Sequence, residues 1–572
     1  MMLASLIASL ATRFLLCGLA ILVGLHPPPA DAATPRAVEL RVSPERDGIR
    51  VQYTMPRARS EFRFDPHAAT SSAARIELTT PGLTLKEGVV SGKAPFKAFS
   101  LFVRPDIRRT EASYAVLSRI GAKGLLLYIP ALQQDPAQGE TRVTIVPPRG
   151  AIAVFGAAKD GLLFIGPSDY VESRDGLTMV VPPETPDILR TRIRDRANAF
   201  ITFYTGALRR PPSHNPVLVV DHDASGGRQG FTGDVTPNGV VLLQLTVAMA
   251  GEDFGAESLV SRFLAHELFH LWNVGSYRDR SGLNGNWLLE GSAEYASWLA
   301  AEALAPEAHS LEDRVTQQLA PCMATLGDDA LVHLADQRAQ TSRYSCGAIV
   351  HWLADVAARR SGTDILSVWA TLLADPGGYD IADFEKLMGV HNSRAEPLAK
   401  ILRGTGKDRW PQIFAALKLV GVNVPVVPPG TDALRAAAVQ TLLLQDCSGE
   451  GIGFETLGLT EPPVAVVLRT EPMSPEHILK CDLLSGDPHL MAVNAHSALG
   501  DWGPILKEVA AACADRAEIA LALRRARKDE TVRMRCERPA LTPRTEYRVS
   551  NALPPIAPSR RTKLRPGAVS PH

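Results

Sequence analysis

The chain has 572 residues, a length that predicts several domains. Lysine plus arginine and aspartate plus glutamate both number 61, so the net charge is zero with histidine neutral. A neutral chain has no general attraction for polyanions, and we expect neither nucleic acid nor an anionic membrane as a partner. The hydrophobic content of 45% is that of an ordinary globular protein and argues against a disordered chain.

The first 32 residues are predicted to be a signal peptide. Arg13 precedes an apolar run from Phe14 to Leu25, and residues 30–32 (Ala-Asp-Ala) form a small-x-small cleavage signal. The run is too short for a comfortable membrane span. We expect a periplasmic or secreted protein cleaved near Ala32, with an uncleaved membrane anchor as the alternative.

Residues 33–155 are predicted to form an N-terminal β domain. Segments such as 38–42, 49–53 and 75–79 alternate apolar and polar residues, and turn residues separate them. We expect an antiparallel β-sandwich without chemistry of its own.

Residues 156–260 mix helical and strand patterns. Residues 186–204 predict a long helix, and residues 216–221 and 239–245 predict two buried strands.

The stretch from Ser261 to Asn273 predicts an amphipathic helix with an unusual polar face. His266 and His270 are four residues apart and therefore lie on the same face, where both imidazoles can bind one metal ion. Glu267 can reach a metal-bound water without binding the metal. Two histidines and a glutamate in an otherwise apolar helix reduce stability unless something binds there.

A second helix is predicted over residues 286–305. Glu290, twenty positions after His270, is the candidate third ligand, because catalytic zinc often takes two histidines and one glutamate. Glu294, one turn further along the same face, can accept the remaining ring N–H of a ligand histidine. The alternative is a solvated helix face, which the flanking residues 287–289 (Trp-Leu-Leu) disfavour.

These motifs resemble those of a known group of zinc peptidases. The pattern His266-Glu267-x-x-His270-x-Trp-Asn, followed by Leu-Glu290-Gly-x-Ala-Glu294-Tyr, is similar to that of the gluzincins. The resemblance is strongest to the glycyl aminopeptidase family, a relative of the aminopeptidase N family. It implies a thermolysin-like α+β zinc peptidase domain over residues 156–305, with one Zn²⁺ per chain.

A third motif carries the same resemblance. Tyr344-x-x-Gly347-Ala348 matches a Tyr-x-x-Gly-Ala element that opens a later helix in these families. The resemblance implies that Tyr344 stabilises the oxyanion of the reaction. An ordinary core or surface tyrosine is the alternative.

The chain departs from these families ahead of the metal helix. They carry a glutamate there that binds the free amine of the substrate, whereas this chain has Gly230-Phe-Thr-Gly-Asp234. Asp234 is our candidate substitute. In such peptidases an edge strand before the metal helix holds the substrate backbone. Residues 239–245 are our candidate for that strand, with an ordinary core strand as the alternative.

Residues 306–430 are predicted to form a helical lobe that completes the active-site cleft. Helical patterns recur at residues 348–360, 365–373, 383–388 and 410–417.

Residues 436–538 resemble a PDZ domain. Residues 449–454 resemble its carboxylate-binding loop, and a helix at 502–513 and a strand at 518–523 follow. Such a domain binds peptide C-termini as an added strand. A small α+β domain of another kind is the alternative. Residues 540–572 are rich in proline and arginine and predict a disordered tail.

Six cysteines lie outside the predicted signal peptide. In an exported chain an even number permits disulfides. Cys322 and Cys346 can bridge within the catalytic region, and the other four within the C-terminal part, where spacing does not decide the pairs. Those four are Cys447, Cys481, Cys513 and Cys536.

The sequence therefore predicts an exported zinc peptidase that acts on peptides or proteins, with Glu267 as general base and Tyr344 as oxyanion stabiliser. Aminopeptidase and endopeptidase activity both remain open. Two other classes of function also remain: a catalytically silent peptide-binding scaffold with a structural zinc site, and a hydrolase of a non-peptide substrate.

Overall fold

The computed structural model describes most of the chain after its first 36 residues. The predicted signal peptide lies outside the described residues. Within the described part, no helix is long and apolar enough to cross a membrane. The described ranges are 37–66, 75–106, 115–156, 161–222, 231–236, 238–245, 254–306, 310–334, 336–390, 395–406, 408–448, 453–457, 465–469, 480–525 and 528–556.

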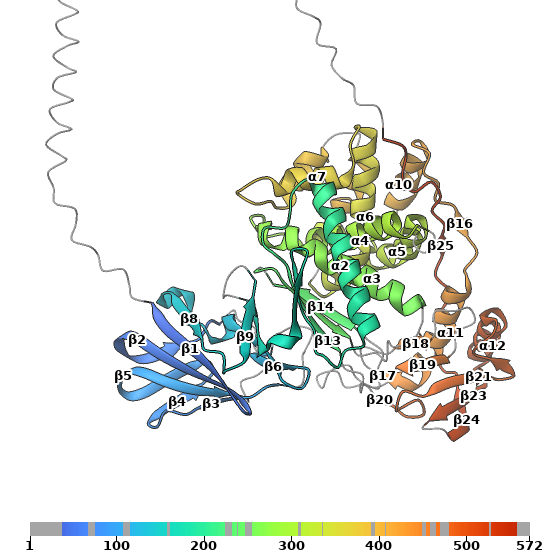
Figure 1. Cartoon of the computed structure of the whole chain (residues 1–572). Helices are drawn as coiled ribbons and strands as arrows, with labels where there is room; N and C mark the ends of the chain where they lie inside the picture. The colour runs from blue at the N-terminus through green and yellow to red at the C-terminus, as the bar shows by residue number, and fades with distance from the viewer. Residues whose placement is uncertain are drawn as a thin grey trace, which may run out of the picture. The chain divides into compact units, whose positions relative to one another are not determined.

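The chain divides into two compact units (Figure 1). The first comprises Met1–Ser118 and Leu127–Gly150, and the second comprises Arg119–Leu126 and Ala151–His572. The first unit is rich in β-structure and the second combines sheets with helices, so the expected multidomain α+β organisation is confirmed in outline.

The first unit contains a six-stranded sheet of order β3-β5-β2-β1-β8, with β4 paired to β5. The strands predicted at residues 38–42, 49–53 and 75–79 are present. The expectation of a wholly antiparallel arrangement is wrong for β1 and β8, which are parallel, because a long excursion of the chain joins them instead of a hairpin. The bounds are β1 Val38–Glu45, β2 Gly48–Arg63, β3 Ile76–Leu78, β4 Leu83–Lys86, β5 Val89–Val103 and β8 Thr141–Ile145.

A four-stranded sheet follows, of order β6-β7-β10-β9. In this sheet β9 and β10 pair in antiparallel orientation. The bounds are β6 Leu117–Ile120, β7 Gly124–Tyr128, β9 Ala151–Phe155 and β10 Leu162–Pro167.

A five-stranded sheet of order β11-β12-β13-β15-β14 packs against the helix that carries His266 and His270. The expectation that residues 239–245 form the edge strand is wrong. They form β15, which is parallel to β13 on one side and antiparallel to β14 on the other. The chain folds back as a hairpin, so the last strand in sequence is internal, and β14 lies at the edge of the described sheet. The bounds are β11 Val171–Arg174, β12 Leu177–Val180, β13 Val217–His222, β14 Phe231–Val235 and β15 Val240–Leu245.

The helices of this part of the chain share one hydrophobic core with the sheet. The predicted helices are confirmed, but α6 begins twelve residues earlier than its apolar pattern indicates, because its first turns are polar. Tyr344 therefore lies inside α6 and does not open it. The bounds are α2 Asp187–Leu208, α3 Phe254–Asn273, α4 Asn286–Leu304, α5 Leu311–Leu326, α6 Asp336–Arg360, α7 Ile365–Leu373, α8 Ile381–Met388, α9 Glu396–Leu402 and α10 Arg409–Lys418.

Helices α4 and α6 touch backbone to backbone. A Cβ atom placed on Gly291 would lie 2.3 Å from Gly347 Cα, and one on Gly347 would lie 2.6 Å from Gly291 Cα. No side chain fits between them, so both positions require glycine. Because Gly291 follows Glu290 and Gly347 lies three residues after Tyr344, this contact fixes α4 and α6 to each other beside the candidate site.

The C-terminal part is an α+β assembly. Its main sheet has the order β18-β19-β21-β23-β24, with β22 paired to β21, and the predicted helix and strand at 502–513 and 518–523 are present. Residues 449–452 of the predicted carboxylate-binding loop lie outside the described residues, so the PDZ assignment stays a prediction. The bounds are β16 Val426–Val427, α11 Thr431–Asp446, β17 Cys447–Ser448, β18 Gly453–Leu457, β19 Ala465–Arg469, β20 Lys480–Cys481, β21 His489–Val493, β22 His496–Ser497, α12 Trp502–Asp515, β23 Glu518–Arg525 and β24 Lys528–Arg535.

The prediction of a disordered tail is wrong for residues 540–556, which we call the C-terminal strap. Its strand β25 (Glu546–Tyr547) pairs with β16, and Val549 and Ala552 are buried. The Trp352 indole N–H donates to the Ala552 carbonyl oxygen at 2.8 Å. A few apolar residues and backbone hydrogen bonds order a segment whose average composition is that of a tail. Residues 557–572 lie outside the described part.

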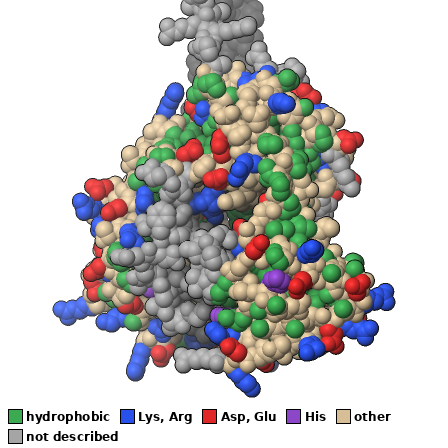
Figure 2. Space-filling model, turned by 90° about the vertical axis from the view of Figure 1, so that its right-hand side faces the viewer, with side chains coloured by type: hydrophobic (Ala, Val, Ile, Leu, Met, Phe, Trp, Pro, Cys, Tyr) green, Lys and Arg blue, Asp and Glu red, His purple; other side chains and the backbone are tan. Residues whose placement is uncertain are grey.

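Three disulfides join Cys322 to Cys346, Cys447 to Cys481 and Cys513 to Cys536. The bridge between Cys322 and Cys346, which the sequence permits without requiring it, is present and ties α5 to α6. Acidic and basic side chains are interspersed over the face shown in Figure 2, as the balanced composition leads one to expect.

Replacing Gly291 or Gly347 with alanine is expected to force α4 and α6 apart. Overpacking of this kind typically lowers the free energy of unfolding by about 1–3 kcal/mol, and backbone atoms cannot rotate away as side chains do. Thermal unfolding measures the effect. The matched control is Gly206→Ala in α2, where a Cβ meets no described atom within 4 Å. Alanine there should stabilise the helix by up to about 1 kcal/mol. Equal melting temperatures for Gly291→Ala and the wild type would contradict the close contact.

Candidate active site

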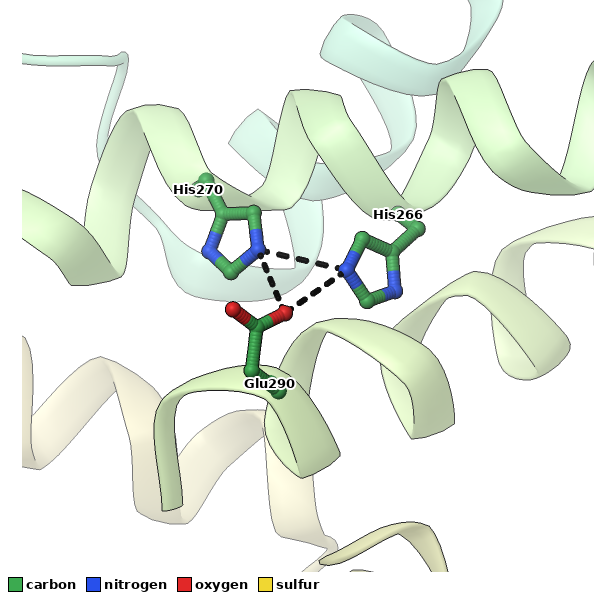
Figure 3. Close-up of side chains that lie close together, drawn as sticks. All are labelled: His266, His270 and Glu290. Carbon is green, nitrogen blue, oxygen red and sulfur yellow. Dashed lines mark hydrogen bonds and ion pairs between the residues drawn. The ribbon is translucent and has the colours of Figure 1, made fainter. Parts of the chain in front are cut away.

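Three candidate ligands converge from two helices (Figure 3). His266 and His270 come from α3 and Glu290 from α4. The Nε2 atoms of the two histidines are 3.2 Å apart, and Glu290 Oε2 lies 3.2 Å from His266 Nε2 and 3.4 Å from His270 Nε2. Tetrahedral zinc with bonds of about 2.0–2.1 Å separates its ligand atoms by about 3.3 Å. The donor types and their spacing therefore fit a zinc ion.

The two histidines of the cluster are buried, and Glu290 is half-buried. His266 is 4% exposed and His270 is 7% exposed. Burial opposes ionisation of Glu290, but its hydrogen bonds with both histidines outweigh that effect and lower its pKa below the ordinary value. A dication binds a carboxylate in its ionised form and imidazoles in their neutral form, so metal binding would release protons from the two histidines.

Glu294 contacts the second ring nitrogen of His266, as expected from its place one turn after Glu290. Its Nδ1 lies 3.1 Å from Glu294 Oε2, and Glu294 Oε1 accepts the Trp298 indole N–H at 2.9 Å. With both carboxylate oxygens engaged, Glu294 can hold the ring so that Nε2 faces Glu290.

The corresponding support for His270 is Asn273, whose role the sequence analysis missed. His270 Nδ1 lies 2.9 Å from Asn273 Oδ1. The Asn273 amide donates to the Leu289 carbonyl at 3.1 Å and to Ser292 Oγ at 3.0 Å, which ties α3 to α4. The available signal was a polar residue three positions after His270 on an apolar helix.

The back of α3 is held by aromatic packing. The Tyr204 hydroxyl of α2 donates to the Ala265 carbonyl at 3.0 Å. Its ring meets those of Phe269 and Trp272 edge to face, with centroids 5.3 and 5.7 Å away. These contacts anchor the helix on the apolar side, so that its histidine side faces α4.

Glu267 is the buried carboxylate beside the cluster. It is 6% exposed, and burial is the main cause that raises its pKa to about 7, against the charges of His266 and His270. A carboxyl group in this position can accept a proton in one step and return it in a later one.

Strand β14 passes directly over Glu267. A Cβ on Gly233 would lie 3.0 Å from Glu267 Cγ and 2.6 Å from Phe263 Cζ. Asp234 follows on the same strand, and the charges of His270 and Glu290 both act on its carboxyl group. Within the described residues β14 is the edge strand of this sheet, and it borders the cluster.

Tyr344 borders the cluster from α6. Its ring centroid is 5.7 Å from that of His266, and the Arg343 guanidinium lies 4.7 Å from its own centroid. Burial, and then the charge of Glu290, raise the pKa of Tyr344, so its hydroxyl keeps its proton at neutral pH and can donate a hydrogen bond.

No protein-family model matches this sequence, and no curated protein does. Solved structures do resemble it. An aminopeptidase N family protein from Idiomarina loihiensis has a TM-score of 0.51 and 13% identity, covering 90% of this chain and 98% of its own. This likeness shows a shared fold, and it supports the expected resemblance at that level.

Two other matches are looser. An M1 zinc metallopeptidase from Deinococcus radiodurans has a TM-score of 0.36 and 14% identity, covering 65% of this chain and 94% of its own. Yeast LTA4 hydrolase has a TM-score of 0.39 and 12% identity, covering 72% of each chain.

Replacing Asn273 with alanine is expected to weaken zinc binding by about 10- to 100-fold, because His270 loses the partner that orients its ring. Competition with a chelator measures the affinity. Asn273→Asp keeps the oxygen near His270 Nδ1 and should lose less. Unchanged affinity in the alanine variant would show that the ring needs no such support.

Proposed function

We propose that this protein is an exported zinc-dependent peptidase. The observation that carries the proposal is the 3.2–3.4 Å triangle of His266 Nε2, His270 Nε2 and Glu290 Oε2. Export agrees with the three disulfides, since such bonds persist in oxidising compartments. The catalytic domain would span residues 156–305, and the helical lobe 306–430 would complete its cleft.

His266, His270 and Glu290 would hold one Zn²⁺, which when bound acidifies a water molecule and polarises a carbonyl group. Glu267 accepts the proton of the attacking water and delivers it to the leaving amine. The Tyr344 hydroxyl donates to the oxyanion that forms on the former carbonyl oxygen. Glu294 and Asn273 keep the two imidazoles oriented.

The substrate backbone would lie along β14. An edge strand offers N–H and C=O groups that an extended peptide can satisfy. Gly233 lets β14 itself pack closely against Phe263 and Glu267 of α3, so a peptide paired with β14 would lie near Glu267. Asp234 on this strand would bind a free N-terminal amine, which favours an aminopeptidase. An endopeptidase is the alternative within the same mechanism.

The C-terminal part, residues 436–538, would bind peptide C-termini in the manner of a PDZ domain. The alternatives of a silent scaffold and a hydrolase of a non-peptide substrate predict no peptide turnover. Zinc content combined with digestion of a peptide library, with free and blocked N-termini, separates these cases. Cleavage of blocked peptides indicates an endopeptidase, and cleavage of free ones alone indicates an aminopeptidase.

Replacing Glu267 with glutamine is expected to lower kcat by about 10²–10⁴-fold because the proton acceptor is lost, while zinc is retained. Turnover of the best library peptide and metal analysis provide the two readouts. Full activity in this variant would remove Glu267 from the mechanism.

Replacing Tyr344 with phenylalanine is expected to lower kcat by roughly 10²-fold, the usual effect of losing one oxyanion donor. KM and zinc content should change little, because the hydroxyl acts mainly in the transition state. Loss of zinc in this variant would instead assign Tyr344 a structural role.

A further inference from the structure

A cavity of about 450 Å³ opens beside Tyr344 on the helical-lobe side of the site. It lies between α5, α6 and the C-terminal strap. Tyr344 and Ser345 of α6 form one wall, and Arg544 of the strap forms another. Tyr344 also borders the cluster of His266, His270 and Glu290, so the cavity and the cluster share this one side chain.

The lining is polar. Gln318 and Thr325 of α5 join Ser345 and Arg544 around the cavity. Arg544 is exposed, and within the described part of the chain it forms no ion pair. A guanidinium has five N–H donors and suits a carboxylate with two oxygens.

A second cavity, of about 520 Å³, continues from the first along α5 toward α11. Pro321 and Arg544 line both cavities, so Arg544 stands at their junction. Proline inside α5 removes a backbone N–H from the helix at this point. The strap that carries Arg544 is held in place, since the Val549 N–H donates to Thr316 Oγ1 at 2.9 Å.

Opposite charges lie on the two sides of the site: Asp234 on β14 and Arg544 on the helical-lobe side. Two carboxylates, Asp432 and Glu546, also line the second cavity, but Asp432 pairs with Arg435 and Glu546 accepts the Gly430 N–H. A peptide is an amine at one end and a carboxylate at the other. Its amine end is therefore favoured toward β14 and its carboxylate toward the strap.

We propose that Arg544 binds a carboxylate of the substrate in the cavity beside Tyr344, so that the enzyme prefers peptides with an anionic group on that side of the scissile bond. The carboxylate is the C-terminus of a short peptide or an acidic side chain of a longer one. This inference rests on the proposed peptidase function.

The test uses the full-length zinc-loaded protein and sets of otherwise identical peptides. One set pairs a free C-terminus with a C-terminal amide, and the other pairs glutamate with glutamine at successive positions. The variants are Arg544→Ala, Arg544→Lys and, as a matched control, Arg548→Ala. Arg548 is exposed on the same strap but lines neither cavity.

Arg544→Ala should raise KM about tenfold for the carboxylate peptides, leave kcat unchanged and leave the neutral partners unaffected. Arg544→Lys should recover part of the loss, and Arg548→Ala should behave as the wild type. Sensitivity to the terminal amide identifies the C-terminus, and sensitivity to glutamine identifies the side chain. Equal KM values for Arg544→Ala and the wild type on all peptides would overturn the inference, as would an equal effect of Arg548→Ala.

A binding measurement can distinguish a failure of this inference from a failure of the proposed peptidase function. Calorimetry on the Glu267→Gln protein measures peptide affinity without turnover. A tighter affinity for the carboxylate peptide that disappears with Arg544→Ala supports the inference even if no peptide is hydrolysed. Hydrolysis without any dependence of binding on Arg544 would overturn the inference and leave the peptidase intact.

Discussion

The candidate site depends on the backbone contact between Gly291 and Gly347. The distance from either glycine to the other leaves no room for a methyl group, so α4 and α6 cross as closely as two helices can. Glu290 is one residue from this crossing and Tyr344 is three residues from it. A side chain at the crossing would move the third ligand away from the histidines and the phenol away from the cluster together. The motifs that contain Glu290 and Tyr344 lie far apart in sequence, but both require glycine for the same reason, which is the close contact between Gly291 and Gly347.

The cluster itself combines groups that are unfavourable when buried separately. Each has a specific hydrogen-bond partner. Glu294, itself bonded to Trp298, contacts His266, and Asn273, itself bonded to Ser292, contacts His270. The two imidazoles in turn contact Glu290. Such a network is stable only when every member has its partner. It also prepares the site for a dication, because the ligand atoms already have the spacing that zinc imposes.

The surroundings of the cluster divide into a sheet side and a helical side. Within the described residues β14 is the edge strand beside Glu267, and α5, α6 and the C-terminal strap line a polar cavity beside Tyr344. The strap follows the C-terminal α+β part yet returns to pack on the helical lobe, where Trp352 and Thr316 hold it. Arg544 of the strap thereby lines the cavity beside Tyr344.

The sequence alone determined the local features of this protein. Four-residue spacing puts His266 and His270 on one helix face, and apolar periodicity predicts most helices and strands, because both depend only on neighbours along the chain. The tertiary structure alone decided which strand is the edge. In the sheet β15 lies between β13 and β14, although β14 comes before β15 in the sequence. It also decided that Asn273 supports His270, that polar turns extend α6, and that the strap is ordered. Each of these depends on contacts between residues far apart in sequence, which no local pattern records.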